Sequence, residues 1–345
     1  MTHRRTAGIT ALLLGALLAL GGSHRIEAAT TSSADADFAA RCGAPGVLTC
    51  QGFDAASVFT YSSSQTEGLY PIYGTTTLGG FQDTTVKASG ASSLRFDIPG
   101  NTGADMAGNF SWNFGQNFSQ NSTFYVQFQA RFDQNYVGTN WGSLANTSPK
   151  LSIFYDQNGS SCANIELTTV EFYGNPMPIM YSDCGSVSLF GSTTSLGSYS
   201  ASTPLDLQEG SSASSGYNCQ YGSTTAGTGN GSGCFFYPAN TWITFYYKVS
   251  VGTWGQANSW VQAWVAVNGG PYQQFVNIKN YTLNDDGNAA GGFSRIMLTP
   301  YMTGKSSSIS YATAHVWYDE LVVSTQPIAA PNEVLPSSPG NVQVK

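Results

Sequence analysis

Regular alternation of apolar and polar residues most constrains the fold of this chain. In FYVQFQARF (124–132) every second residue is apolar, and the residues between them are Tyr125, Gln127, Gln129 and Arg131. A period of two places successive side chains on opposite faces of a strand. The segment therefore predicts a half-buried strand with one face on a core.

The same pattern recurs from about residue 90 to residue 324. WITFYYKVSV (242–251) alternates in the same way, and 260–276 reads as two strands around an Asn-Gly-Gly turn, which is typical of a hairpin. Further strands are predicted in 150–156, 164–172, 294–302 and 315–323. Residues 33–41 predict one short helix, and no long amphipathic helix follows. Antiparallel strands without intervening helices favour an all-β, two-sheet jelly-roll sandwich.

The first 29 residues have the pattern of a secretory signal peptide. Arg4 and Arg5 form a basic start, 11–20 is an apolar run, and Ala28 and Ala29 offer a cleavage point. The run is too short for a permanent membrane helix, and no later segment is apolar enough to span a membrane. We therefore expect a soluble protein, secreted to the periplasm or the extracellular medium.

The charge of the chain bears on its partners. The formal net charge is −7, and removing 1–29, which holds three of the 13 basic and one of the 20 acidic residues, leaves −9. An acidic surface disfavours nucleic acid and anionic membranes, because binding to either needs basic patches. The composition is instead rich in Gly, Ser, Thr, Asn and Tyr, which predicts a hydrogen-bonding, aromatic surface.

An even number of cysteines in an exported chain predicts disulfides. All six follow the leader: Cys42, Cys50, Cys162, Cys184, Cys219 and Cys234. Six cysteines allow fifteen pairings, and we expect the sequential one because each bond then closes a local loop. Zinc binding is disfavoured, since CxxC spacing and histidine partners are missing.

The chain after the leader predicts a single jelly-roll domain over 30–324. Within it, about 185–240 is rich in Ser and Gly and is expected to be a long insertion held by Cys219–Cys234. Residues 325–345 contain four prolines and predict an extended C-terminal tail.

Several segments resemble a known family. The run FYVQFQARF…SPKLSIFYD…NIELTTVEF, then WITFYYKVSVGTW…VQAWVAVNGG and RIMLTPYMT…HVWYDELVVST, is similar to the concanavalin A-like jelly roll of lectins, glucanases and several polysaccharide lyases. RCGAPGVLTCQGFD, SCANIELT, MYSDCG and WYDELVVSTQPI resemble, more narrowly, exported bacterial proteins of this fold that mostly lack an assigned function. The resemblance covers about residues 40–328 and implies carbohydrate recognition on the concave sheet.

Glycosidases of this fold need two facing carboxylates. The ExDxxE strand of the glucanases is absent, and the nearest pair is Glu166 and Glu171 in IELTTVE. Their odd spacing places them on opposite faces of a regular strand. A glycosidase therefore requires a bulge between them.

A β-eliminating lyase needs a group that neutralises a uronate carboxylate and groups that move protons. Gln127, Gln129 and Arg131 share the polar face of one predicted strand and are candidates for substrate binding, together with Tyr125 and Glu166. Candidates for proton transfer are Lys150, Tyr301 and His315, the last histidine left after the leader. The QIH and YxxGxYxQ motifs of lyases with this fold are absent, and the alternative is that these residues only solvate a strand face.

Two other hypotheses concern single segments. The oxygen-rich stretch NDDGN (284–288) suits Ca²⁺, with Asp285 and Asp286 as candidate ligands, although a solvated turn is the simpler interpretation. The stretch HVWYDELVV predicts a closing strand in which His315 shares a face with Trp317, Asp319, Leu321 and Val323.

The function favoured by these residues is secreted, lectin-like binding of a polysaccharide. Aromatic side chains suit the C–H faces of sugars, and the candidates are Trp141, Trp260, Trp264, Trp317, Tyr125, Tyr246 and Tyr301. The first alternative is a polysaccharide lyase, which is favoured over a glycoside hydrolase if the protein is an enzyme. The second is a surface-structural or adhesive protein without catalysis.

Overall fold

The computed structural model describes most of the chain between residues 33 and 331. The exceptions are 62–66, 73–74, 104–106, 140, 142–147, 157–164, 173–174, 183–185, 190–191, 196–234, 286–289, 304 and 309. All described residues belong to one compact unit, Ser32–Lys345.

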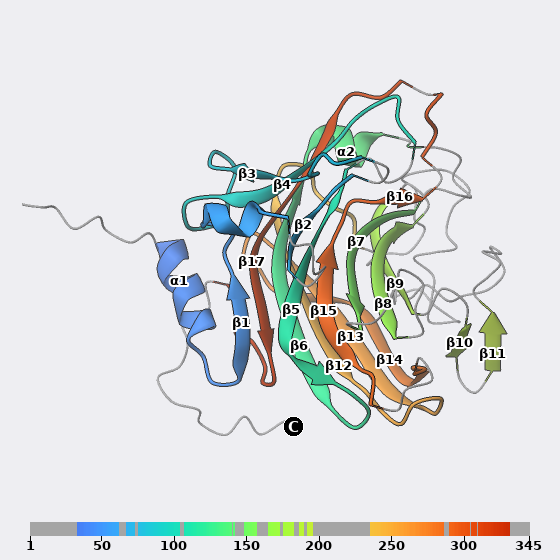
Figure 1. Ribbon diagram of the computed structural model, residues 1–345. Helices are drawn as coiled ribbons and strands as arrows, with labels where there is room; N and C mark the ends of the chain where they lie inside the picture. The colour runs from blue at the N-terminus through green and yellow to red at the C-terminus, as the bar shows by residue number, and fades with distance from the viewer. Residues whose placement is uncertain are drawn as a thin grey trace, which may run out of the picture. The chain divides into compact units, whose positions relative to one another are not determined.

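Strands dominate the described residues (Figure 1). The elements in chain order are α1 (Ser33–Cys42), β1 (Val47–Gln51), the 3₁₀ helix η1 (Ala56–Phe59), β2 (Gly68–Tyr70), β3 (Phe81–Asp83), β4 (Ser93–Ile98), β5 (Asn109–Phe118), β6 (Thr123–Phe132), α2 (Gln134–Gly138), β7 (Ser148–Tyr155), β8 (Glu166–Phe172), β9 (Asn175–Ser182), β10 (Ser186–Leu189), β11 (Ser192–Ser195), β12 (Trp242–Ser250), β13 (Ala257–Val267), β14 (Gln273–Thr282), β15 (Phe293–Leu298), β16 (Met302–Thr303) and β17 (Ala314–Ser324).

These strands form two antiparallel sheets. The ten-stranded sheet has the order β11-β10-β14-β13-β12-β6-β17-β4-β3, and β1 also pairs with β17. The seven-stranded sheet has the order β2-β5-β15-β7-β8-β9, and β16 also pairs with β7. The predicted all-β, two-sheet jelly-roll sandwich is confirmed.

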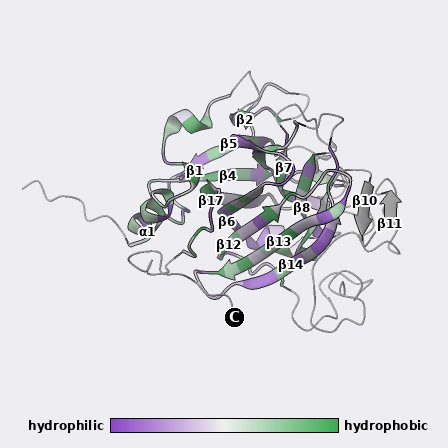
Figure 2. Cartoon of the chain, turned by 90° about the horizontal axis from the view of Figure 1, so that it is seen from below, coloured by the Kyte–Doolittle hydropathy of each residue, from purple (hydrophilic) through white to green (hydrophobic). Residues whose placement is uncertain are grey.

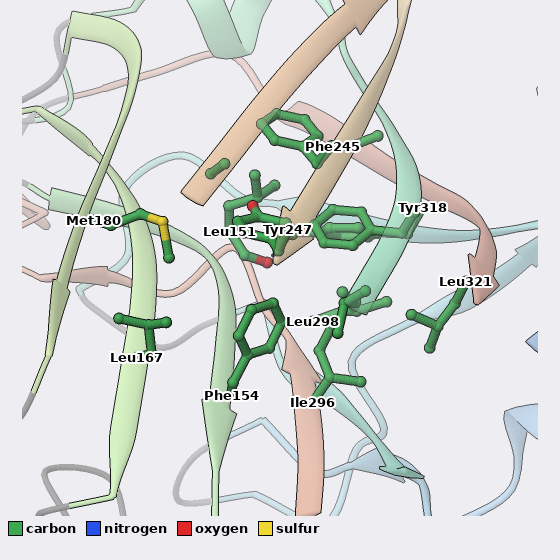
Figure 3. Close-up of a cluster of buried hydrophobic side chains, with 14 of the residues drawn as sticks. Leu151, Phe154, Leu167, Met180, Phe245, Tyr247, Ile296, Leu298, Tyr318 and Leu321 are labelled. Carbon is green, nitrogen blue, oxygen red and sulfur yellow. Dashed lines mark hydrogen bonds between the residues drawn. The ribbon is translucent and has the colours of Figure 1, made fainter. Parts of the chain in front are cut away.

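The core lies between the two sheets, where apolar faces meet (Figure 3). The ring of Phe154 on β7 is 5.9 Å from that of Phe124 on β6 and 5.0 Å from that of Tyr247 on β12. These contacts join the seven-stranded sheet to the ten-stranded one. Packing of two alternating sheets in this way leaves each with an outer face of polar and aromatic residues.

The alternation predicted for 124–132 is confirmed. Phe124, Val126, Phe128, Ala130 and Phe132 all belong to the core. The hairpin around Asn268 and Gly269 is also confirmed, with φ of 48° and 68° at these residues. Asn and Gly tolerate such left-handed backbone conformations better than other residues, which explains why they occupy this turn.

The face predicted for β17 is only partly correct. A bulge lies between Asp319 and Val322, and Glu320 within it has φ of 51°. The extra residue shifts the alternation, so that Leu321 and Val323 point into the core instead of sharing the face of His315. Regular alternation does not reveal a bulge, and the predicted position of these two side chains is therefore wrong.

Helix α1 is anchored by a buried ionic network. The guanidinium of Arg41 pairs with Glu320 in the β17 bulge and with Asp37 one turn earlier in α1, and it donates to Oε1 of Gln127 at 2.7 Å. Arg41 and Glu320 are both almost completely buried. The bulge in β17 therefore provides the carboxylate that holds the helix.

The disulfide between Cys42 and Cys50 is confirmed and joins the end of α1 to β1. The other four cysteines, Cys162, Cys184, Cys219 and Cys234, lie outside the described residues. The predicted pairings among those four therefore remain predictions.

The described residues cover only parts of the predicted insertion and C-terminal tail, and none of the predicted leader. The leader, residues 1–29, lies outside the described residues, as does most of 185–240. At the start of that segment β10 and β11 form a hairpin next to β14. Of the C-terminal tail, 325–331 is described, and it lies against the ten-stranded sheet, where the amide of Gln127 donates to the Ala329 carbonyl at 2.8 Å. None of the described helices is long and apolar enough to cross a membrane.

Candidate active site

The structure divides the predicted site residues between two surfaces. Lys150 and Glu166 lie on strands of the seven-stranded sheet, and Tyr301 lies between β15 and β16 beside it. His315 and the polar residues of β6 lie on the ten-stranded sheet. The apolar core separates the outer faces of the two sheets, so these two groups do not form one site.

The outer face of the seven-stranded sheet follows from strand register. Phe154 points into the core, so the neighbouring Tyr155 points outward. Tyr155 is directly opposite Glu166 on β8 and Arg295 on β15, and Arg295 is in turn opposite Asn113 on β5. Directly paired residues of antiparallel strands project to the same side. A row of a phenol, a carboxylate, a guanidinium and an amide therefore crosses this side of the sheet. Tyr155, Glu166 and Arg295 in this row are almost completely buried.

Lys150 and Tyr301 lie close together on this side of the molecule. The backbone N–H of Lys150 donates to the Tyr301 carbonyl at 2.7 Å, and Nζ of Lys150 is 5.4 Å from the centroid of the Tyr301 ring. Burial lowers the pKa of Lys150, while the neighbouring Glu166 and Tyr301 act in the opposite direction. The pairing of β7 with β8 has a bulge between Lys150 and Ser152. Both side chains are only partly buried.

A second polar group adjoins them. Oγ of Ser111 lies 2.9 Å from the hydroxyl of Tyr155. Burial raises the pKa of Tyr70 to about 12, and Tyr155 adds to this effect, whereas a hydrogen bond with Ser111 and the charge of Arg295 lower it. Tyr70 therefore keeps its proton at neutral pH and can donate a hydrogen bond, while the raised pKa makes it a weaker proton donor than an ordinary tyrosine.

Five of these residues were not predicted from the sequence: Tyr70, Ser111, Asn113, Tyr155 and Arg295. Alternation indicates that Arg295 interrupts an apolar run in β15, and Tyr155 follows an inward Phe154. Alternation alone does not tell which strands are neighbours. The pairing of β15 with both β5 and β7, which are distant in sequence, brings these side chains together.

The two glutamates of β8 lie on opposite faces. Glu166 is on the outer face and accepts a hydrogen bond from Oγ1 of Thr168 at 2.6 Å. Glu171 is buried among Tyr136, Tyr237 and Tyr318, and burial raises its pKa well above the usual range of a carboxyl group. The pair therefore cannot flank one glycosidic bond, as the odd spacing predicted.

His315 is partly exposed and contacts two carboxylates. Its Nδ1 is 2.8 Å from Asp133 and its Nε2 is 3.6 Å from Asp97. Oδ1 of Asp133 also accepts the backbone N–H of Tyr136 and so caps α2. The imidazole further stacks on Trp317 with ring centroids 5.6 Å apart. These contacts tie β17 to the start of α2.

The predicted substrate-binding residues of β6 are largely engaged inside the protein. The amide nitrogen of Gln127 donates to Tyr272 and Ala329, and that of Gln129 donates to Glu320 at 2.6 Å. Tyr125 stacks on Tyr246, with centroids 6.3 Å apart. The guanidinium of Arg131 lies 5.9 Å from the Trp317 ring. Gln127 and Gln129 therefore secure α1 and the C-terminal segment.

The predicted Ca²⁺ site lies partly outside the described residues. Asp285 is described and partly buried, whereas Asp286 is not described. Within the described ranges, no group of three or more His, Cys, Asp or Glu residues could hold a metal ion. Ca²⁺ binding at Asp285 and Asp286 remains a prediction.

The class that the fold defines is the two-sheet jelly-roll sandwich, with a polar site on the outer face of the smaller sheet. No protein-family model matches the chain, and no curated protein matches it. Solved structures with similar folds include the PL-14 alginate lyase from Aplysia kurodai, at 13% identity and TM-score 0.41, covering 72% of this chain and 87% of that one. Another is the endo-β-1,4-glucuronan lyase from the fungus Trichoderma reesei, at 10% identity and TM-score 0.46, covering 84% of this chain and 100% of that one. A third is the cellulose-induced protein Cip1, at 14% identity and TM-score 0.44, covering 81% of this chain and 97% of that one. The fold assignment rests on the two sheets themselves.

Proposed function

We propose that the protein is a polysaccharide lyase that cleaves uronate-containing chains by β-elimination at the outer face of the seven-stranded sheet. The supporting observation is the pairing of Lys150 with Tyr301, 5.4 Å from Nζ to the ring centroid, on a face that also carries Arg295 and Tyr155. An amine, two phenols and a guanidinium supply the groups that this reaction needs.

The reaction proceeds through a carbanion-like state next to the uronate carboxylate. A base removes the C5 proton, and the C5–H electron pair forms the C4=C5 double bond. The C4–O bond breaks, its electron pair stays on the leaving oxygen, and a donor protonates that oxygen. Placed acids and bases accelerate such transfers by roughly 10²–10⁴-fold.

Lys150 is the proposed base. A neutral amine is required for this role, and the lowered pKa of Lys150 increases the fraction of neutral amine near pH 7. Tyr301, whose ring lies next to that amine, is the proposed donor to the leaving oxygen. Proton transfer from Tyr301 to the leaving group leaves a phenolate. The protonated Lys150 can then return its proton to this phenolate, which restores both groups to their starting state.

Arg295 is the proposed partner of the uronate carboxylate. A guanidinium binds a carboxylate through two parallel hydrogen bonds and stays charged at all working pH values. Neutralising the carboxylate favours loss of the neighbouring proton, because the negative charge that develops at C5 is delocalised into it. Tyr155, directly opposite Arg295 in the sheet, is placed to position the same sugar.

Lectin-like binding without cleavage is the second candidate function. It is favoured by the aromatic side chains on the outer face of the ten-stranded sheet, where Tyr246 contacts Tyr125, Trp264 and Tyr272. We also propose export of the chain, based on the signal-like pattern in 1–29. Sequencing the N-terminus of the protein recovered from the medium tests that point, and retention of the first 29 residues contradicts it.

A panel of acidic and neutral polysaccharides distinguishes lyase from lectin. We expect an acidic polymer to yield products that absorb in the ultraviolet through a conjugated unsaturated uronate. Lys150→Met should abolish this signal, and Lys87→Met, which changes a lysine of the loop after β3, is the matched control. Retention of a polymer without any cleavage would support the lectin and contradict the lyase.

A further inference from the structure

We infer that the outer face of the ten-stranded sheet carries a second, non-catalytic binding surface for an acidic polysaccharide, centred on Trp260 between Lys248 and Lys279. This surface lies on the opposite sheet from the candidate active site. The inference does not depend on the proposed lyase activity, since it concerns binding alone.

Strand register builds the surface from three neighbouring strands, which lie side by side in Figure 2. Across β12, β13 and β14, one row contains Lys248, Gln262 and Asn277. The row two positions away on one side contains Trp260 and Lys279. The row two positions away on the other side contains Tyr246, Trp264 and Gln274. Alternate rows project to the same face, so cations, amides and indoles lie together.

The indole of Trp260 is flanked by ammonium groups from both neighbouring strands. Nζ of Lys248 is 5.1 Å and Nζ of Lys279 is 4.6 Å from the ring centroid. Nε1 of Trp260 donates to Oδ1 of Asn277 at 2.9 Å, which fixes the ring orientation. Cation–π attraction holds both ammonium groups at the ring and leaves their remaining N–H donors for an anion.

The local charge is opposite to that of the whole protein. The stretch from residue 242 to residue 282 contains Lys248 and Lys279 but no Asp or Glu, whereas the whole chain has 20 acidic residues and a net charge of −7. A cationic region on an acidic protein selects an anionic ligand through complementary potential.

The remaining side chains of the surface fit a sugar. Trp264 lies 5.5 Å from Tyr246 between ring centroids, and both are partly exposed. Aromatic faces contact the C–H faces of sugars, and the amides of Gln262, Gln274 and Asn277 suit hydroxyl groups. Carboxylates on the sugars match the two lysines, so a polyuronate is the ligand class that uses every group.

Affinity gel electrophoresis in native gels tests the inference without turnover. Wild-type protein should migrate more slowly in a gel containing polygalacturonate than in a gel containing dextran. The variant Lys248→Gln/Lys279→Gln should lose most of this retardation, and Trp260→Phe should lose part of it. Lys87→Gln is the matched control, because it removes one lysine outside the surface, and it should migrate like wild type in both gels.

Two results would overturn the inference. The first is equal migration of wild-type protein in the two gels. The second is wild-type retardation of the double lysine variant, which would place polyuronate binding elsewhere, for example at Lys150. Circular dichroism and thermal melting of each variant confirm that the fold is retained. The gel assay measures binding alone, so its result does not depend on whether the protein cleaves the polymer.

Discussion

The carboxyl group of Glu171 lies beside the hydroxyl of Tyr136 in the core between the two sheets. Burial raises the pKa of Glu171 well above its usual value, and the hydrogen bond with Tyr136 only partly offsets this effect. An inward carboxyl group on β8 also explains why this strand cannot supply a glycosidase pair. It makes the stability of the fold depend on pH.

The raised pKa of Glu171 predicts lower stability at higher pH. The folded state keeps a proton that the unfolded chain loses above about pH 4.3, so this group destabilises the fold increasingly as pH rises toward its folded pKa. Glu171→Gln should remove this contribution and stabilise the protein by about 1–3 kcal/mol near pH 8. Urea unfolding at about pH 5 and about pH 8 measures it, and a larger gain at the lower pH would contradict it.

The reactivity of Lys150 should depend on Glu166. If the neutral amine is the base, kcat/KM rises as pH increases through the pKa of Lys150. Glu166 raises that pKa, so Glu166→Gln should move the ascending limb to lower pH. A pH–rate profile on an acidic polysaccharide tests the shift, and an unchanged or upward-shifted limb would show that Lys150 is not the titrating base.

Substitution of Lys150 also separates a base from a binding cation. Lys150→Arg keeps the positive charge but cannot accept a proton at neutral pH. We expect it to reduce kcat by roughly 10²–10⁴-fold, as Lys150→Met does. Substantial rescue by arginine, with kcat within about tenfold of wild type, would assign Lys150 to binding the uronate carboxylate instead.

His315 should be dispensable for catalysis. It lies on the ten-stranded sheet and bridges Asp133 and Asp97. His315→Asn should leave kcat within about twofold of wild type while lowering the free energy of unfolding by about 1 kcal/mol, because the contact to the α2 cap is weakened. A turnover assay and urea unfolding give both values, and loss of turnover in a folded variant would return His315 to the active site.

Removing one partner of the Arg41–Glu320 pair should destabilise the fold more than removing both. Arg41→Met leaves the carboxylate of Glu320 buried without its guanidinium and should cost about 3–5 kcal/mol, whereas Arg41→Met/Glu320→Gln should cost less. Urea unfolding of the two single variants and the double variant provides the coupling energy. Additive losses would show that the two side chains act independently.

The sequence alone determined the inward faces of the regular strands, such as β6 and β12. In β6 each inward residue follows the alternation, since a half-buried strand needs one apolar face. The turn at Asn268 and Gly269 and the local disulfide Cys42–Cys50 are likewise short-range features with their own chemical signals. They could be predicted because every residue that decides them is a near neighbour in the chain.

Tertiary structure decided which polar side chains lie on the same side of the molecule. Lys150, Tyr301 and Arg295 share one side of the molecule because β15 pairs with β7, and His315 is separated from them by the whole core. The bulge at Glu320 reversed the expected direction of Leu321 and Val323. Strand pairing depends on packing between distant segments, and periodicity describes only the faces of each strand. The physical reason is that alternation fixes inside from outside, whereas neighbours across a sheet are selected by the free energy of the assembled core.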